Sequence, residues 1–133
     1  MASTAPASAK SSHLILTDQR LILVRFTGTV SLSDITRGVE ELWADARYDP
    51  TYNGIVNLDR TTIRAGIEDV RSLISFLHNQ RASSSIWAVV FSEPKATALA
   101  MVFKAAWRGS FKLEIVSTWE AACRFLQVDL PAY

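Results

Sequence analysis

The chain has 133 residues, of which 49% are hydrophobic and 20% are charged, and its formal net charge is +1. This composition is typical of one globular domain with a sizeable core rather than of a disordered or membrane-embedded chain. A net charge so close to zero gives no electrostatic basis for binding nucleic acid or an anionic membrane surface, and we expect neither partner.

The two ends of the chain and its cysteine content bear on location. Residues 1–12 are rich in Ala and Ser and lack the apolar core of a signal peptide, so we interpret them as a disordered leader ahead of one domain at 13–133. Cys123 has no second cysteine to pair with, which favours a reducing compartment. No apolar stretch reaches the roughly 20 residues needed to span a bilayer, so we expect a cytoplasmic protein without a membrane span.

The first half of the domain is predicted to contain a hairpin, a helix and a short strand. Two β-rich runs, 13–17 and 21–27, flank a turn, and Gly28 is expected to end the second run. Ser31 and Asp34 have the spacing of a capping box, which predicts a helix from there to about Ala46. After a turn-rich segment, residues 55–58 are predicted to form a strand that ends at Asp59.

The second half alternates helices with strands. We expect helices at 67–77, 94–107 and from 117 onward, and strands at 86–91 and 111–115. The run 86–91 has no polar alternation, as in a central strand covered on both faces, whereas 111–115 alternates apolar with charged residues and indicates an edge strand. Ser117 and Glu120 suggest a second capping box. The order ββαβαβαβα predicts an α/β domain with a mixed, mainly parallel sheet of about five strands covered by about four helices.

The predicted helix at 94–107 is apolar on two faces. One stripe is expected to face the core and comprises Ala96, Leu99, Ala100, Phe103, Ala106 and Trp107. Ala98, Met101, Val102 and Ala105 fall on the opposite face, where a surface helix normally carries charges. We therefore predict that this second stripe is covered by a second copy of the chain, another protein or an apolar ligand. The alternative is that the leader or residues 128–133 of the same chain fold over it.

With its elements in order, the chain resembles the STAS domain family, in particular the SpoIIAA-like branch with the anti-sigma-factor-antagonist fold. Three features, within about 13–128, carry the resemblance: the hairpin ending in Gly28, the strand Ile-Val-Asn-Leu-Asp at 55–59, and the strand and Ser-x-x-Glu-Ala helix start at 115–122. The resemblance implies a non-enzymatic regulatory or protein-interaction module. It also allows a module that binds a lipid or another small ligand.

The phosphorylation site of that family is missing. Classical members carry Asp-Ser-Ser/Thr-Gly where the third strand meets its helix, and a serine there is the phosphorylated switch. The corresponding residues 63–66 read Ile-Arg-Ala-Gly, and the nearest hydroxyls, on Thr61 and Thr62, are displaced from the motif. The phosphorylation switch of the family therefore cannot be carried over to this chain.

The segment 59–66 is the best candidate for a ligand or partner loop, because open α/β proteins bind ligands where parallel strands end. Its candidate residues are Asp59, Arg60, Thr61, Thr62 and Arg64. They precede a helix N-terminus, whose free N–H groups favour a phosphate or carboxylate. In the alternative interpretation Asp59 caps the loop and the arginines are solvated, and Glu68 and Asp69 argue against a strong anion site.

No motif in the chain indicates a catalytic or metal centre. His13 and His78 lie far apart and lack a matching carboxylate pattern, and Cys123 falls on the inward stripe of the last helix. Asn57 is expected to point into a covered sheet and to find a structural hydrogen-bond partner. We therefore expect no enzymatic activity, no cofactor and no metal.

Overall fold

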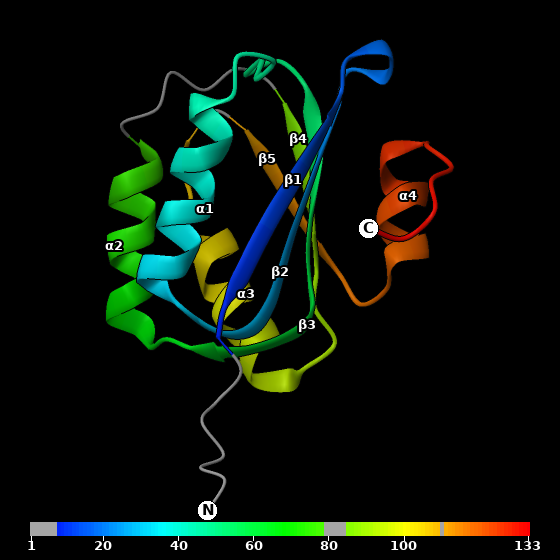
Figure 1. Ribbon diagram of the computed structural model, residues 1–133. Helices are drawn as coiled ribbons and strands as arrows, with labels where there is room; N and C mark the ends of the chain where they lie inside the picture. Colours follow the sequence, from blue (N-terminus) through cyan, green and yellow to red (C-terminus); the bar gives the residue numbers. More distant parts are fainter. Residues whose placement is uncertain (1–7, 79–84, 110) are drawn as a thin grey trace, which may run out of the picture.

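A five-stranded sheet with helices on both faces forms the protein, as the computed structural model in Figure 1 shows. The structure describes residues 8–78, 85–109 and 111–133. Its elements are β1 (Lys10–Leu16), a short 3-10 turn (Thr17–Gln19), β2 (Leu21–Ser31), α1 (Leu32–Ala44), β3 (Asn53–Arg64), α2 (Ile67–His78), β4 (Ile86–Val90), α3 (Pro94–Ala106), β5 (Lys112–Val116) and α4 (Trp119–Leu126). This order confirms the predicted α/β class.

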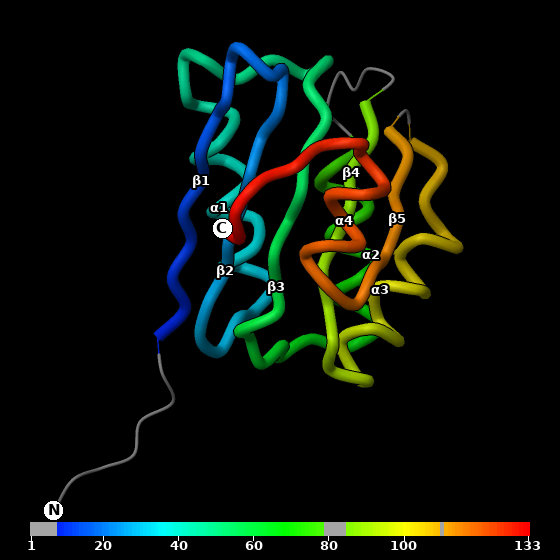
Figure 2. The backbone as a smooth tube through the Cα atoms, turned by 90° about the vertical axis from the view of Figure 1, so that its right-hand side faces the viewer, coloured from blue at the N-terminus to red at the C-terminus, as the bar shows by residue number. Residues whose placement is uncertain are grey.

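The strands lie side by side in the order β1-β2-β3-β4-β5. β1 is antiparallel to β2, and every other neighbouring pair is parallel. β4 is a central strand and β5 an edge strand, as predicted. Helices α1, α2 and α3 cover one face, whereas α4 and the C-terminal tail cover the other (Figures 1 and 2). No helix in the described ranges is long and apolar enough to cross a membrane.

Three strand boundaries differ by three residues or more from those predicted. β1 begins at Lys10, so residues 10–12 belong to the sheet rather than to a leader; residues 1–7 lie outside the described part of the chain. Gly28 does not end β2, because glycine tolerates its φ of 86° and the strand continues beside β3 to Ser31. β3 likewise continues past Asp59 to Arg64.

A β-bulge explains why β3 was predicted too short. Arg25 of β2 lies opposite Asn57 and Thr27 opposite Arg60, so two residues of β3, Leu58 and Asp59, face one residue of β2. Before the bulge the even-numbered residues of β3 point toward α1–α3, and after it the odd-numbered residues such as Ile63 do. The simple alternation that marks a strand in a sequence is therefore broken in the middle.

The helix ends follow local hydrogen bonding. Ser31 and Asp34 form the predicted capping box, with the Ser31 hydroxyl accepting from the Asp34 N–H and the Asp34 carboxylate accepting from the Ser31 N–H at 2.9 Å. α1 ends at Ala44 rather than Ala46, and α3 ends at Ala106 with Trp107 as its C-cap. α4 is capped by Thr118, whose hydroxyl accepts from the Ala121 N–H; Ser117, the predicted cap, lies one residue too early.

Candidate functional site: an apolar cavity under three helices

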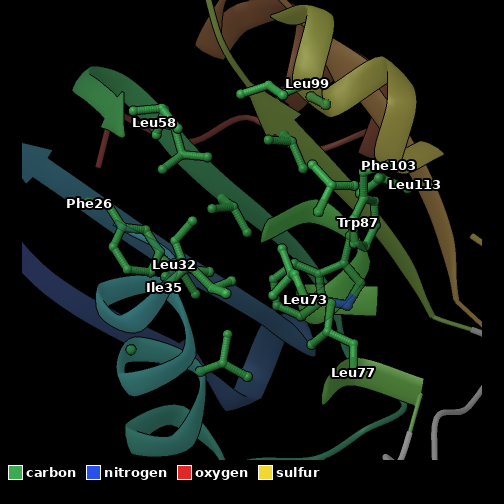
Figure 3. Close-up of a pocket in the computed structure, with 18 of the residues that line it drawn as sticks. Phe26, Leu32, Ile35, Leu58, Leu73, Leu77, Trp87, Leu99, Phe103 and Leu113 are labelled. Atoms are coloured by element: carbon green, nitrogen blue, oxygen red, sulfur yellow. The ribbon is translucent and has the colours of Figure 1, made fainter. Parts of the chain in front are cut away.

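A cavity of about 240 Å³ lies between the sheet and the helices α1, α2 and α3. A single water needs only about 10–15 Å³ of such space, so the cavity can hold a molecule with many non-hydrogen atoms. Figure 3 shows side chains of both layers pointing toward one another across it. Its position between the sheet and the helices and its apolar lining make it the strongest candidate for a binding site in the described part of the chain.

The lining is formed by apolar side chains from every element on this face. The strands supply Val24, Phe26, Val56, Leu58, Ile63, Trp87, Val89 and Leu113. The helices supply Leu32, Ile35, Val39, Leu42, Trp43, Val70, Leu73, Leu77, Ala96, Leu99, Ala100 and Phe103. An apolar cavity of this kind does not hold ordered water well, since water needs several polar partners. The lining therefore favours an apolar occupant.

The cavity exists because α2 is attached to its neighbouring helices rather than to the sheet. α2 packs mainly against α3 and, less extensively, against α1. Val70 of α2 joins Phe103 and Trp107 of α3 in a separate apolar cluster, and Phe76 of α2 stacks on Trp43 of α1 with ring centroids 5.1 Å apart. In Figure 1, α2 is correspondingly the helix farthest from the sheet. The space beneath it is the cavity.

Helix α1, by contrast, approaches the sheet closely at one point. A side chain at Gly38 would come within 2.8 Å of the Phe26 ring, so only glycine allows this contact between α1 and β2. Leu42, one turn further along α1, is 4% exposed. The close contact between α1 and β2 thus forms one boundary of the cavity. From there the cavity extends toward β3, β4 and α2.

Few polar groups line the cavity. Asp69 is the one charged residue among the described lining residues, and its carboxylate accepts a hydrogen bond from the Gly66 N–H at 2.8 Å. Burial raises the pKa of the Tyr48 phenol, an effect that the neighbouring Trp43 side chain opposes in part. The remaining polar groups are the Ser85 hydroxyl and the Trp87 indole N–H, both at the β4 end.

The predicted loop residues lie on a strand instead. Asp59, Arg60, Thr62 and Arg64 are exposed residues of β3, and the predicted loop at 59–66 is wrong because pairing with β2 continues to Arg64. The Asp59 carboxylate accepts from the Ser92 hydroxyl at 2.7 Å, and the Thr61 hydroxyl donates to the Leu58 carbonyl at 2.6 Å. The five residues follow one another along this strand rather than forming a loop. An anionic ligand at Arg60 and Arg64 stays a prediction.

The outer stripe of α3 is exposed. Met101 is 52% and Val102 40% exposed, and Ala98 and Ala105 are exposed beside them. The tail does not cover the stripe: residues such as Val128, Leu130 and Tyr133 pack on the opposite face of the sheet. The alternative of coverage by the tail is therefore wrong, while coverage by the leader falls on residues outside the described ranges. Ala106, predicted to face inward, is exposed, and so is Ile67 at the start of α2, by 56%.

Several single-residue predictions are confirmed. Asn57 donates to the Tyr133 carbonyl at 3.1 Å and accepts from the Asp59 N–H, so its amide ties the tail to the sheet. Cys123 is buried in the core beneath α4, and burial raises the pKa of its thiol.

Neither histidine belongs to a cluster of candidate metal ligands among the described residues. His13 pairs with Asp45 at 2.9 Å. The described residues contain no group of three or more His, Cys, Asp or Glu side chains placed to hold a metal.

Comparison with known proteins adds no assignment, since no protein-family model matches the chain and no curated protein matches it in sequence.

The cavity is the feature of the candidate site that the sequence did not predict. Its lining residues were assigned to ordinary core stripes, and sequence patterns do not measure the distance between a helix and a sheet.

Proposed function

We propose that the protein is a non-enzymatic cytoplasmic module that binds a small apolar molecule in the cavity between the sheet and α1–α3. The observation that carries this proposal is a partly open cavity of about 240 Å³ whose lining is almost entirely apolar. Filling it with an apolar ligand would remove lining side chains from contact with empty or water-filled space, which stabilises the complex by the hydrophobic effect. The resemblance to STAS domains, which include ligand-binding modules, agrees with binding rather than catalysis.

The test is to ask whether the protein carries or takes up an apolar molecule in this space. Native mass spectrometry of the gently purified protein is expected to show a bound acyl or isoprenoid compound, or uptake of an added neutral probe such as N-phenylnaphthylamine. The variant Val89→Phe fills the cavity from β4 and should abolish uptake. Val102→Phe makes the same change on the exposed face of α3 and should leave uptake intact. Equal uptake by both variants, or none by the unmodified protein, would refute the proposal.

A second candidate function is protein interaction through α3, as a homodimer or with another protein. It is favoured by Met101 and Val102, large apolar side chains exposed side by side between exposed alanines. Small residues let a facing helix approach closely, and methionine adapts to an irregular partner surface. The double variant Met101→Glu with Val102→Lys should convert an associated species into a folded monomer in light scattering. A protein that is monomeric at high concentration before any substitution rules out the homodimer.

A further inference from the structure

Of the four indole N–H groups in the chain, that of Trp87 stands apart. The N–H groups of Trp107 and Trp119 donate to the carbonyls of Phe111 and Leu130 at 3.0 and 2.9 Å. The Trp43 side chain has the Tyr48 hydroxyl as its polar neighbour. The Trp87 N–H has no acceptor among the described residues. Trp87 is half-buried, and no fully enclosed side-chain N or O atom among the described residues lacks a partner, so this N–H is open to a partner from outside these residues.

The position of the Trp87 ring is fixed by the strand next to it. Gly54 of β3 lies directly opposite Trp87 of β4, and the ring occupies the space that a side chain at Gly54 would take. On the cavity side, Trp87 of β4 and Leu73 and Leu77 of α2 all belong to the lining that Figure 3 draws. The ring is therefore held against the sheet at one end of the cavity that it lines.

Ser85 supplies a second unpaired polar group at the same place. It is the one polar residue in the buried core of the described chain, at 5% exposed, and its hydroxyl has no hydrogen-bond partner there. Ser85 precedes Trp87 by two residues, which puts both side chains on the cavity face of the strand about 7 Å apart. No fully enclosed side-chain N or O atom among the described residues lacks a partner. Neither group is therefore both fully enclosed and unpaired, and both residues line the cavity.

The charges around the cavity limit what could pair with these groups. None of the described lining residues is Lys, Arg or His, and Asp69 lies at the start of α2 with its carboxylate already bonded to the Gly66 N–H. A carboxylate or phosphate brought into this space would lose its hydration without gaining a cation, which is strongly unfavourable. A neutral oxygen loses much less, and the indole N–H and the hydroxyl can replace its bonds to water.

We infer that the cavity takes an uncharged ligand with an apolar body and one terminal oxygen, such as an alcohol, ketone or ester. The ligand oxygen accepts a hydrogen bond from the Trp87 N–H and pairs with the Ser85 hydroxyl, while the apolar body extends under α2 toward β3. This inference rests on the proposed function and adds to it the chemical class of the ligand and its orientation in the cavity.

The experiment compares three ligands of equal chain length, decane, decanol and decanoate, by displacement of N-phenylnaphthylamine from the full-length protein. The variants are Trp87→Phe, which keeps an aromatic ring but removes the N–H, and Ser85→Ala. Each is expected to weaken decanol binding about five- to tenfold, the effect of one lost hydrogen bond, and to leave decane binding unchanged. Decanoate should bind the unmodified protein at least about tenfold more weakly than decanol. In the NMR spectrum of the unmodified protein, decanol but not decane should move the Trp87 indole proton downfield.

The outcomes separate the two proposals. If decane and decanol both bind but respond equally to the two variants, or if decanoate binds more tightly than decanol, the ligand class is wrong and the apolar binding function stands. If none of the three displaces the probe and the probe itself does not bind, the binding function is wrong as well. The NMR shift depends on no variant, so it decides the case even if a substitution prevents folding.

Discussion

On the face of the sheet beneath α4, Leu21, Ile55 and Val90 are at most 2% exposed, whereas on the face beneath α1–α3 the neighbouring Val56 and Val89 are only half-buried. Ile22 and Val30, also on the α1–α3 face, are fully buried, so the looser packing of that face is confined to its β3–β4 part. The α4 face is covered by one helix of eight residues and a tail, and the other face by three longer helices. The difference shows that the number of covering helices does not decide how well a sheet is packed. α4 contacts β3, β4 and β5 directly, while α2 is held by other helices at a distance from the strands.

The largest test of this comparison uses two valines that are adjacent in β4. Val90→Ala removes methyl groups from a site that is 1% exposed beneath α4 and should lower the free energy of unfolding by about 2–3 kcal/mol. Val89→Ala makes the same change where a cavity already exists and should cost less than about 1 kcal/mol. Urea denaturation monitored by circular dichroism measures both. Equal losses would mean that the two faces are packed alike.

A second test compares two tryptophans. Trp119→Phe removes the indole donor of the Leu130 carbonyl beneath α4 and leaves it only the weak Cys123 thiol donor at 3.9 Å, so the free energy of unfolding should fall by about 2 kcal/mol. Trp87→Phe breaks no hydrogen bond with the described residues, so only van der Waals contacts are lost. The free energy of unfolding should therefore fall by about 1 kcal/mol or less. The same denaturation experiment applies. A larger loss for Trp87→Phe would show that its N–H has a stabilising partner within the protein.

The third test concerns how α1 is held. Because α1 borders a cavity, its capping box should contribute measurably to stability. Ser31→Ala should therefore lower the free energy of unfolding by about 1 kcal/mol. Ser33→Ala, an exposed change in the first turn of the same helix, is the control and should stay within about 0.5 kcal/mol. Hydrogen exchange of the α1 amides should become faster in the first variant only. Unchanged exchange would show that packing, not the cap, holds the helix start.

The smallest expected effect is a pH dependence at the same cap. Hydrogen bonds from the Ser31 N–H and hydroxyl hold the pKa of the Asp34 carboxyl below its usual value of 3.8. The ionised form is thus favoured in the folded state, so its contribution is complete above about pH 4 and is lost as the pH falls through the lowered pKa. Asp34→Asn should make the acid-induced loss of stability shallower over this range. Superimposable acid titrations of the two proteins, followed by circular dichroism, would contradict this assignment.

Much of the fold could be predicted from local patterns in the sequence. The order of strands and helices follows from periodicity, and Ser31 and Asp34 marked the start of α1 because a capping box depends only on residues four positions apart or fewer. The end of β3 could not be predicted, because Asp59 to Thr62 form a polar run in which the bulge hides the alternation. The cavity could not be predicted either, since the stripes that line it are the same stripes that would fill a dense core. Only Ser85, a hydroxyl ahead of an uninterrupted apolar strand, carried a local signal of an unusual environment.

The bulge in β3 also determines where the length of this strand can vary. Asp59 and Arg60 are consecutive exposed residues, so a chain lacking residue 59 would restore plain alternation and still direct Leu58 and Ile63 toward the helices. An added residue between 60 and 63 would instead reverse the direction of every later side chain in the strand. Arg64 would then point toward the cavity and Ile63 toward solvent. Insertions and deletions in β3 should therefore be tolerated near position 59 and excluded two or three residues later.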